Sequence, residues 1–333
     1  MKRELPDEGV EPAVTRLHAG FRTPRPTLFD IVREAVGQEP DPESVVKIVR
    51  GYDSEVYRVR TVAATAVVIR IRRDGDIPYE QEAWALEQAG RAGVPVPEVL
   101  LLTERRINRV RRPVMVQRCL PGRNLVDLLP VFTGAQKERV LRQAGEALRR
   151  LHTVAVDGFY RRRSDGTWDF PDWASRMASA LREREEETPL LLAAGLTDDE
   201  IRRGLNAIER YTVDFPCPQP VLLHADVSAE HFFADETGNL TGMLDFGDFY
   251  GGPPEADIAY FTVNDPELPL EWLLDGYGDR SEWGDREAFL QRLLRYQVVL
   301  LPGDVAFAAE MENAEETERL LGAYRAVLNR LAP

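Results

Sequence analysis

Two aspartates on either side of a short turn are the side chains best suited to catalysis. Asp226 lies in HADVSAEH, residues 224–231, and Asp245 opens DFGD, residues 245–248. The segment DETGN at 235–239 is typical of a hairpin turn, and a hairpin there would bring the two carboxylates close together. One carboxylate of such a pair can accept the proton of a substrate hydroxyl while the other binds a divalent cation. The spacing therefore favours phosphoryl transfer.

The same stretch is also compatible with other interpretations. His224 and His231 could join the two aspartates as ligands of a metallohydrolase. Against this, the chain has only two other histidines, His18 and His152, and His152 ends an amphipathic pattern typical of a packed core residue. In two further alternatives, His224 and Asp226 only hold a loop together, or a kinase-like module binds nucleotide without catalysis. A pure binder has no use for a base at Asp226.

The N-terminal third of the chain predicts a small sheet with flanking helices. A helix is expected to begin at Thr27, because Thr27 and Asp30 fit a capping box and apolar residues then recur at helical spacing. A second helix is expected from about Glu80 to Ala92, ended by the prolines of GVPVP at 93–97. Short β-branched runs predict strands at 44–50, 55–62, 65–72, 98–104 and 113–120, with a turn at 105–112.

The C-terminal part of the chain predicts mainly helices. Apolar residues recur at helical spacing from Gln136 onward, and only residues 221–246 interrupt this pattern with a strand, a loop and a hairpin. We therefore expect an α+β fold with two lobes. The expected division is a loose arm at 1–24, a small β-rich lobe at 25–118 and a larger helical lobe at 119–333.

Composition limits the possible partners. Hydrophobic residues make up 44% and charged residues 29%, which excludes a disordered or fibrous chain. Lys and Arg number 42 against 56 acidic residues, so the arginine-rich stretch 105–112 is better explained as a solvated hairpin tip than as a nucleic-acid patch. The apolar runs fall short of the ~18 residues that span a membrane, and Cys119 and Cys217 lack metal-ligand spacing. We expect a cytoplasmic monomer without nucleic-acid or membrane partners.

Three stretches together resemble the aminoglycoside phosphotransferase family. They are HADVSAEHFF at 224–233, LDFGD at 244–248 and GPPEADIAYF at 252–261, and the resemblance extends over roughly residues 28–330. Members of this family are antibiotic kinases with the two-lobed, protein-kinase-like fold. The resemblance implies a kinase that uses Mg²⁺ with ATP or GTP, bound between the lobes, to phosphorylate a small-molecule hydroxyl. Walker and GxGxxG motifs are absent, so the sequence gives no support for a P-loop or a Rossmann nucleotide site.

The resemblance also implies roles for individual residues. Asp226 would be the catalytic base, and Asp245 the metal-binding aspartate of the D-F-G element. His231 occupies the position of a metal-binding Asn, as in a subset of the family. Because Mg²⁺ prefers oxygen ligands, this leaves open whether His231 binds the metal directly or through water. Asp257 would brace the catalytic loop, and His224 is expected to be a scaffold residue.

The same resemblance implies which residues bind the nucleotide. The turn GYDSE at 51–55, with Gly51 and Ser54, would cover the phosphates. Arg70 on the third strand would bind phosphate oxygens, held there by Glu82, because Arg keeps the charge of the usual Lys and can bind bidentately. The alternatives are an exposed strand arginine and a solvated helix glutamate. The hinge that contacts the purine would include the backbone of Gln117 and Cys119.

The acceptor prediction is based on local charge. Between Pro253 and Glu318 there are 16 acidic residues against four arginines and no lysine, so this segment carries most of the chain's net charge of −14. In the family the acceptor binds downstream of the D-F-G element, where carboxylates would attract a polycationic amino sugar. An aminoglycoside is therefore the first choice, and a macrolide, an amino alcohol or a sugar are alternatives. The candidate residues are Asp265, Glu267, Glu310, Glu312, Glu315 and Glu316.

Overall fold

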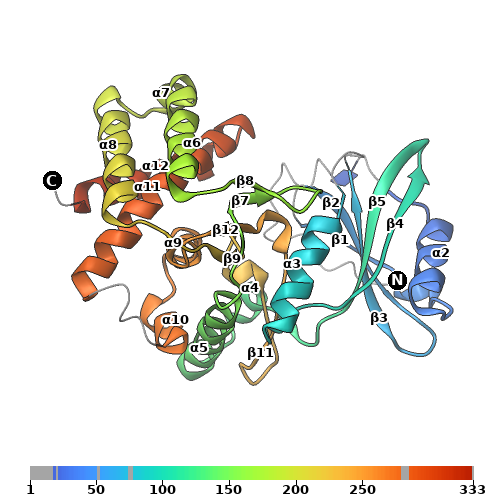
Figure 1. The fold of residues 1–333 in the computed structure, drawn as a ribbon. Helices are drawn as coiled ribbons and strands as arrows, with labels where there is room; N and C mark the ends of the chain where they lie inside the picture. The colour runs from blue at the N-terminus through green and yellow to red at the C-terminus, as the bar shows by residue number, and fades with distance from the viewer. Residues whose placement is uncertain (1–17, 20–21, 51–52, 74–77, 279–284, 332–333) are drawn as a thin grey trace. The chain divides into compact units, whose positions relative to one another are not determined.

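Five antiparallel strands form the sheet of the N-terminal unit in the computed structural model (Figure 1). Their order is β1-β2-β3-β5-β4, and all neighbouring pairs are antiparallel. The five strands that the sequence predicts are therefore confirmed. They are β1 (Val46–Ile48), β2 (Ser54–Arg60), β3 (Ala66–Arg72), β4 (Val99–Ile107) and β5 (Val110–Arg118).

The structure describes residues 18–19, 22–50, 53–73, 78–278 and 285–331. The chain divides into two compact units, of which the first contains Met1–Leu86 and Pro97–Leu120 and the second contains Glu87–Val96 and Pro121–Pro333. The chain first enters the second unit within helix α3 (Glu80–Arg91), returns to the first unit at Pro97 and enters the second unit again at Pro121. Of the arm expected at 1–24, residue Thr23 is buried, and it donates its N–H and hydroxyl to Glu55 at 2.8 to 3.1 Å.

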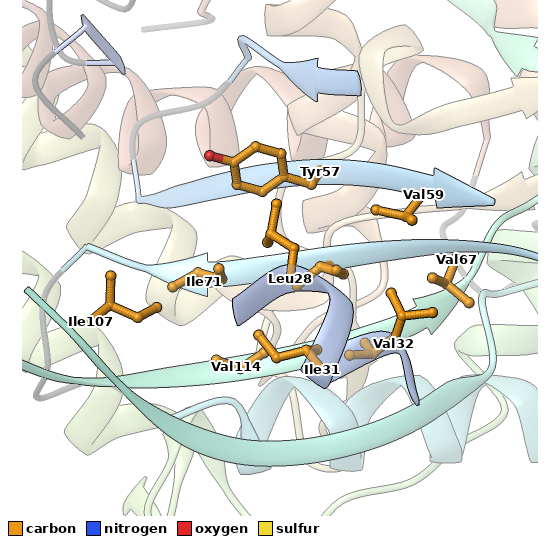
Figure 2. Close-up of a cluster of buried hydrophobic side chains, with 11 residues drawn as sticks. Leu28, Ile31, Val32, Tyr57, Val59, Val67, Ile71, Ile107 and Val114 are labelled. Carbon is orange, nitrogen blue, oxygen red and sulfur yellow. The ribbon is translucent and has the colours of Figure 1, made fainter. Parts of the chain in front are cut away.

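Helix α2 (Arg25–Val36) covers one face of the five-stranded sheet, as Figure 2 shows. Its buried residues, among them Leu28, contact the β-branched side chains that β3 presents on that face. The predicted capping box at Thr27 is wrong. The helix begins two residues earlier, after Pro24 and with a second proline in its first turn, because proline is already restricted to a helical φ. The apolar cluster comprises Leu28, Ile31, Val32, Tyr57, Val59, Val67, Ile69, Ile71, Ile107, Val114 and Val116.

The hairpin between β4 and β5 is tighter than the sequence predicts. The prediction of a turn at 105–112 is wrong, because the strands remain paired up to Ile107 and Val110. Only Asn108 and Arg109 form the turn, with φ of 51° and 70°. Asn tolerates the left-handed region, so two residues are enough to reverse the chain. The arginines before and after them are strand residues.

Helices dominate the second unit, as predicted from residue 136 onward (Figure 1). None of the helices in the described part of the chain is long and apolar enough to cross a membrane. The helices are α4 (Leu125–Leu128), α5 (Gly134–Leu151), α6 (Trp173–Glu186), α7 (Thr188–Ala194), α8 (Asp198–Asp214), α9 (Glu255–Asn264), α10 (Leu270–Tyr277), α11 (Arg286–Glu310) and α12 (Ala314–Arg330).

Two small sheets complete the second unit. One has the order β11-β10-β6 and the other β8-β7-β12-β9. Strands β9, β10 and β11 come from the stretch 221–246 that the sequence sets apart from the helices. The strands are β6 (Arg123–Asn124), β7 (Phe159–Arg162), β8 (Trp168–Phe170), β9 (Val221–Leu223), β10 (Phe232–Ala234), β11 (Leu240–Met243) and β12 (Tyr250–Gly252).

Candidate active site

The hairpin that connects the two aspartates forms as predicted. Strands β10 and β11 pair antiparallel, and the turn between them is the DETGN segment. Asp235 shapes this turn because its Oδ1 accepts the N–H groups of Thr237 and Asn239 at 2.9 and 3.0 Å. These hydrogen bonds favour the ionised carboxylate, so the pKa of Asp235 is lowered. The hairpin returns the chain from His231 to the residues preceding Asp245.

Asp257, near the start of α9, holds the catalytic loop by its backbone. Its carboxylate is fully buried and accepts the N–H groups of His224 and Ala225 at 2.9 and 2.8 Å. His152 donates to the same carboxylate from Nε2 at 3.0 Å, and its Nδ1 lies 2.8 Å from the hydroxyl of Tyr277. These contacts hold Ala225 at a φ of 65°, a left-handed conformation that a side chain disfavours.

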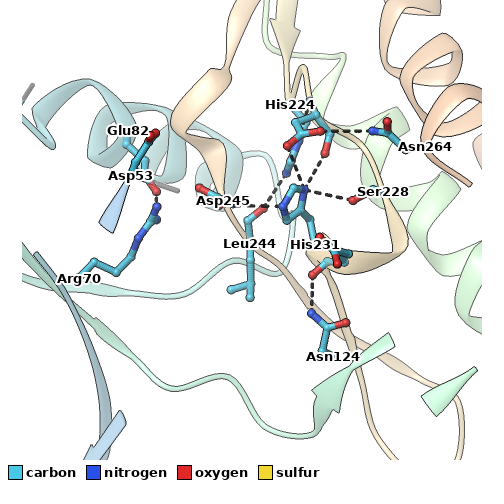
Figure 3. A network of polar contacts seen from close by, with 12 residues as sticks. Asp53, Arg70, Glu82, Asn124, His224, Ser228, His231, Leu244, Asp245 and Asn264 are labelled. Atoms are coloured by element: carbon cyan, nitrogen blue, oxygen red, sulfur yellow. Dashed lines mark hydrogen bonds and ion pairs between the residues drawn. The ribbon is translucent and has the colours of Figure 1, made fainter. Parts of the chain in front are cut away.

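Asp226, the next residue along this braced backbone, carries a partly exposed carboxylate that contacts Asn264, and Figure 3 shows the His224, His231 and Asn264 side chains of the same network. The side chain is 41% exposed, which suits a group that must reach a substrate. Its Oδ1 lies 3.3 Å from Nδ2 of Asn264, and its Oδ2 lies 3.6 Å from Nδ1 of His231. The second distance is too long for a hydrogen bond. Nδ1 of His231 instead donates to the backbone carbonyl oxygen of Asp226 at 2.7 Å.

His224 and His231 stack with ring centroids 5.6 Å apart, and their pKa values move in opposite directions. Burial and the neighbouring His231 lower the pKa of His224. Its neutral ring bridges the two strands, since Nε2 lies 2.7 Å from the carbonyl oxygen of Leu244 and Nδ1 accepts the N–H of Asp226 at 3.3 Å. Burial also opposes a charge on His231, but the carboxylates of Asp226 and Asp245 outweigh it and raise the pKa of His231.

The donors around Asp245 fit a divalent cation with few protein ligands. Nε2 of His231 lies 4.0 Å from Oδ2 of Asp245. Because Nδ1–H of His231 faces a carbonyl oxygen, Nε2 is the nitrogen that could face a metal, which would have to displace any proton there. Over the described residues, no group of three or more His, Cys, Asp or Glu side chains could hold a metal. In proteins Mg²⁺ takes one or two carboxylates and completes its shell with phosphates and water.

In the N-terminal unit, Arg70 pairs with Glu82 (Figure 3). It alternates along β3 with Ile69 and Ile71 of the apolar cluster, so it belongs to the other face of the sheet. Glu82 is buried and stands in the first turn of α3, so it presents a fixed carboxylate to the strand. Arg72, two residues further along β3, lies on the same face with its NH2 3.7 Å from Oε2 of Glu82. The predicted pair therefore exists, and a second guanidinium shares its carboxylate.

Tyr79 links this pair to the phosphate-covering turn expected at 51–55. The guanidinium of Arg72 lies over the Tyr79 ring, with Cζ of Arg72 4.7 Å from the ring centroid. The hydroxyl of Tyr79 lies 2.7 Å from Oγ of Ser54. Asp53 also reaches Arg72, at 3.2 Å. Gly51 lies outside the described residues, but Ser54 is buried and tied to the same face as the arginines.

The expected hinge follows directly from β5. Gln117 is a buried residue within the strand, paired with Val68 and Val99. The N–H of Cys119 donates to the carbonyl oxygen of Ala66 at 3.1 Å, so this N–H is already used. Burial raises the pKa of the Cys119 thiol, which is typical of an unreactive cysteine.

The six acidic candidates for acceptor binding differ in their surroundings. Asp265 follows α9, and its Oδ2 accepts the N–H of Ala229 in the catalytic loop at 2.7 Å. Burial is the main cause that raises the pKa of Asp265 to about 6. Glu316 is held by Arg319 at 2.6 and 2.7 Å. The side chains of the remaining four are exposed: Glu267, Glu310, Glu312 and Glu315.

The sequence interpretation missed two residues near Asp226. Asn264 contacts its carboxylate, and Asp304 lies on α11 where burial, with Asp226 as the second cause, raises the pKa of Asp304 to about 7. A signal for Asn264 existed, because it follows Asp257 by seven residues and so lies on the same face of a helix, two turns away. Asp304 carries no such signal, since its burial depends on the packing of α11.

Comparisons with known proteins agree with this fold. A model of the phosphotransferase enzyme family, APH, matches residues 44–297. A ternary complex of a thermostable mutant of aminoglycoside phosphotransferase APH(4)-Ia with AMP-PNP and hygromycin B shows 17% identity and a TM-score of 0.71, over 91% of this chain and 98% of that chain. A search of curated proteins found no match.

Two other solved structures have the same fold. A candidate fructosamine-3-kinase from Thermobifida fusca YX-ER1 shows 19% identity and a TM-score of 0.60, over 89% of this chain and 99% of that chain. The GDP and kanamycin complex of APH(2")-IIia shows 16% identity and a TM-score of 0.64, over 90% and 98%. Likeness at this level of identity concerns the fold, and it confirms the expected kinase-like α+β class.

Proposed function

The chain belongs to the phosphotransferase enzyme family, and from this premise we propose that it transfers the γ-phosphoryl group of ATP or GTP to a hydroxyl of an aminoglycoside. The enzyme class, a small-molecule kinase, follows from the family and the fold. The nucleotide, the metal and the acceptor are the proposed parts.

The observation that carries the proposal is the environment of Asp226. Its backbone neighbours are fixed by a buried carboxylate, while its own carboxylate is 41% exposed. Within the described residues Oδ2 has no hydrogen-bond donor, so it can accept the proton of a hydroxyl that attacks the phosphoryl group. A general base in this position supports transfer to an alcohol.

Asp245 would hold Mg²⁺ through a carboxylate oxygen, with Nε2 of His231 on the same side at 4.0 Å. When bound, the cation supplies charge neutralisation for the phosphate oxygens. The protein residues do the remaining work. His231 keeps its Nδ1 on the carbonyl oxygen of Asp226, which ties the metal-facing ring to the base. Asp245 adopts a φ of 61°, so a left-handed backbone conformation sets the direction in which its side chain leaves the chain.

Arg70, held by Glu82, would bind the nucleotide phosphates in the N-terminal unit. Glu82 orients the Arg70 guanidinium, and a guanidinium binds two phosphate oxygens at once. Gly51 and Ser54 belong to the turn proposed to cover the phosphates, and the backbone of Gln117 and Cys119 to the hinge. The solved relatives carry AMP-PNP in one case and GDP in another, which supports a nucleotide of either base.

The acceptor proposal is supported by carboxylates around the base. Asp265 and Asp304 both have raised pKa values, mainly because of burial, with repulsion from Asp226 next for Asp304 and from Glu230 and then Asp226 for Asp265. Ammonium groups of an amino sugar would relieve this repulsion. Solved relatives bind hygromycin B and kanamycin, which supports the same acceptor class.

A nucleotide-consumption screen tests the proposal. Purified protein with Mg²⁺ and ATP or GTP is assayed against aminoglycosides, macrolides, hygromycin-like compounds, choline and simple sugars, with Asp226→Asn as the control. We expect phosphorylation of at least one aminoglycoside and its loss in the control. Phosphorylation of only neutral or anionic acceptors would overturn the acceptor class. Tightly bound zinc without nucleotide binding would favour the hydrolase alternative.

A further inference from the structure

Helix α9 holds the catalytic loop at both of its ends, but in different ways. Near its start, Asp257 binds backbone N–H groups, and just after its end Asp265 binds another. Between them, Asn264 contacts the side chain of Asp226. We propose that Asn264 is a positioning residue, which fixes the carboxylate of Asp226 so that one chosen oxygen meets the acceptor hydroxyl. This inference rests on the proposed function.

The chemistry of its two partners determines how the Asn264 amide is oriented. Nδ2 lies 3.3 Å from Oδ1 of Asp226 and 3.3 Å from the carbonyl oxygen of Val227. Both partners are acceptors at neutral pH, so only the NH₂ end of the amide can face them. Its two N–H groups then form a fork that ties the carboxylate to the next residue of the backbone.

The fork distinguishes the two oxygens of the base. Oδ1 is occupied by Asn264, whereas Oδ2 lacks a hydrogen-bond donor throughout the part of the chain that the structure describes. Nδ1 of His231, at 3.6 Å, is instead directed to a carbonyl oxygen. Oδ2 is therefore the oxygen that takes the proton, and rotation of the carboxylate would break the bond to Asn264.

A backbone brace alone does not explain this contact. The loop is already fixed by Asp257 at two N–H groups and by Asp265 at a third. Asn264 is uncharged, so it can hold Oδ1 without neutralising the base. A lysine or arginine in its place would stabilise the carboxylate more strongly and make it a weaker base.

A comparison of variants measures the effect. Asn264→Ala is expected to lower kcat about 10- to 100-fold, because small misplacements of a reacting group cost this much, while KM for the nucleotide stays unchanged. The matched control is Asn124→Ala, because Asn124 donates to the carbonyl oxygen of Glu230 in the same loop but does not contact Asp226. Asn264→Leu, which keeps about the same size, carries no charge and cannot donate, should behave as Asn264→Ala, and it replaces that variant if the alanine protein does not fold.

A double-mutant cycle with Asp226→Asn separates positioning from bracing. Single-turnover rates are measured for each variant in both backgrounds. If Asn264 acts through the carboxylate, its substitution has less than about a twofold effect once the base is gone, whereas Asn124→Ala changes the rate by the same factor in both backgrounds. Equal losses from Asn264→Ala in both backgrounds, or an unchanged kcat, would overturn the inference. Near wild-type activity of Asp226→Asn itself would instead refute the proposed function.

Discussion

The catalytic loop and the acidic segment that ends α11 both carry conspicuous charges, but they differ in how those charges are held. In the loop at 224–231, buried partners bind the backbone of His224 and Ala225, and Asn264 holds the side chain of Asp226. At 310–315, the carboxylates of Glu310, Glu312 and Glu315 are exposed, and the structure shows no ion pair for them within its described ranges. A carboxylate that is held by hydrogen bonds has a fixed orientation and can take part in catalysis. A solvated carboxylate contributes only to the electrostatic potential of the surface.

Asp226→Asn is the strongest test of whether the positioned carboxylate of Asp226 is the catalytic base. Removing the base while the loop keeps its hydrogen bonds should lower turnover by roughly 10²–10⁴-fold. The measurement is phosphoryl transfer, made after circular dichroism shows a folded protein. Turnover near that of the wild type would mean that this well-ordered loop is only structural.

Asp304 sharpens the comparison because it is an acidic residue of the same C-terminal region that is only partly exposed. Burial raises its pKa to about 7 from an ordinary value of 3.8, so the folded state binds this proton more tightly than the unfolded state. Its contribution to stability is therefore complete below about pH 4 and is lost as the pH rises toward about 7. Asp304→Asn should remove this slope and stabilise the protein at pH 8 by on the order of 2 kcal/mol.

The test is denaturant unfolding of the wild type and of Asp304→Asn at pH 5 and pH 8. Glu312→Gln, at an exposed position, serves as the control and should leave the pH dependence unchanged. If the free energy of unfolding changes equally between pH 5 and pH 8 for the wild type and for Asp304→Asn, Asp304 is as solvated as its exposed neighbours.

Arg70 extends the comparison to the N-terminal unit. Its side chain is 13% exposed and paired with Glu82, whereas the side chain of Arg111 is 83% exposed. Arg70→Ala should weaken nucleotide binding by roughly 1.5–3 kcal/mol, the value of a hydrogen bond to a charged group. Arg111→Ala should leave it unchanged. Calorimetric titration with ATP and with GTP measures both, and equal affinities for all three proteins would remove Arg70 from the site.

Glu315→Gln should have the smallest effect. An exposed carboxylate in the first turn of α12 contributes little to binding a cation. We expect KM for the acceptor to change by less than about twofold, compared with a clear increase for Asp265→Asn, whose carboxylate is tied to the catalytic loop. A larger effect of Glu315→Gln would mean that the acidic segment binds the acceptor directly.

The sequence predicted those features that depend on local pattern. Strand alternation placed Val67, Ile69 and Ile71 in the core and Arg70 on the opposite face, and turn-forming residues placed the hairpin before Asp245. The prediction was wrong at 105–112, because an arginine-rich composition does not distinguish a turn from two paired strands. Asn108 alone, a residue that accepts a positive φ, indicates where the chain reverses.

Features that depend on packing could not be predicted in this way. Arg72 shares Glu82 with Arg70 only because the first turn of α3 lies against that strand face. Asp304 is desolvated because of the elements packed around α11, and no spacing in the sequence indicates this. The general charge of the region predicted an acceptor site but did not identify which carboxylates lie near Asp226.

The spacing of Asp257 and Asn264 along α9 also limits how this segment can change in length. Seven residues span about 10.5 Å and almost two full turns, so both side chains reach the loop from one face. A single inserted or deleted residue between them would rotate Asn264 by about 100° away from the loop. Insertions and deletions within α9 should therefore be excluded in any active member that keeps this pair.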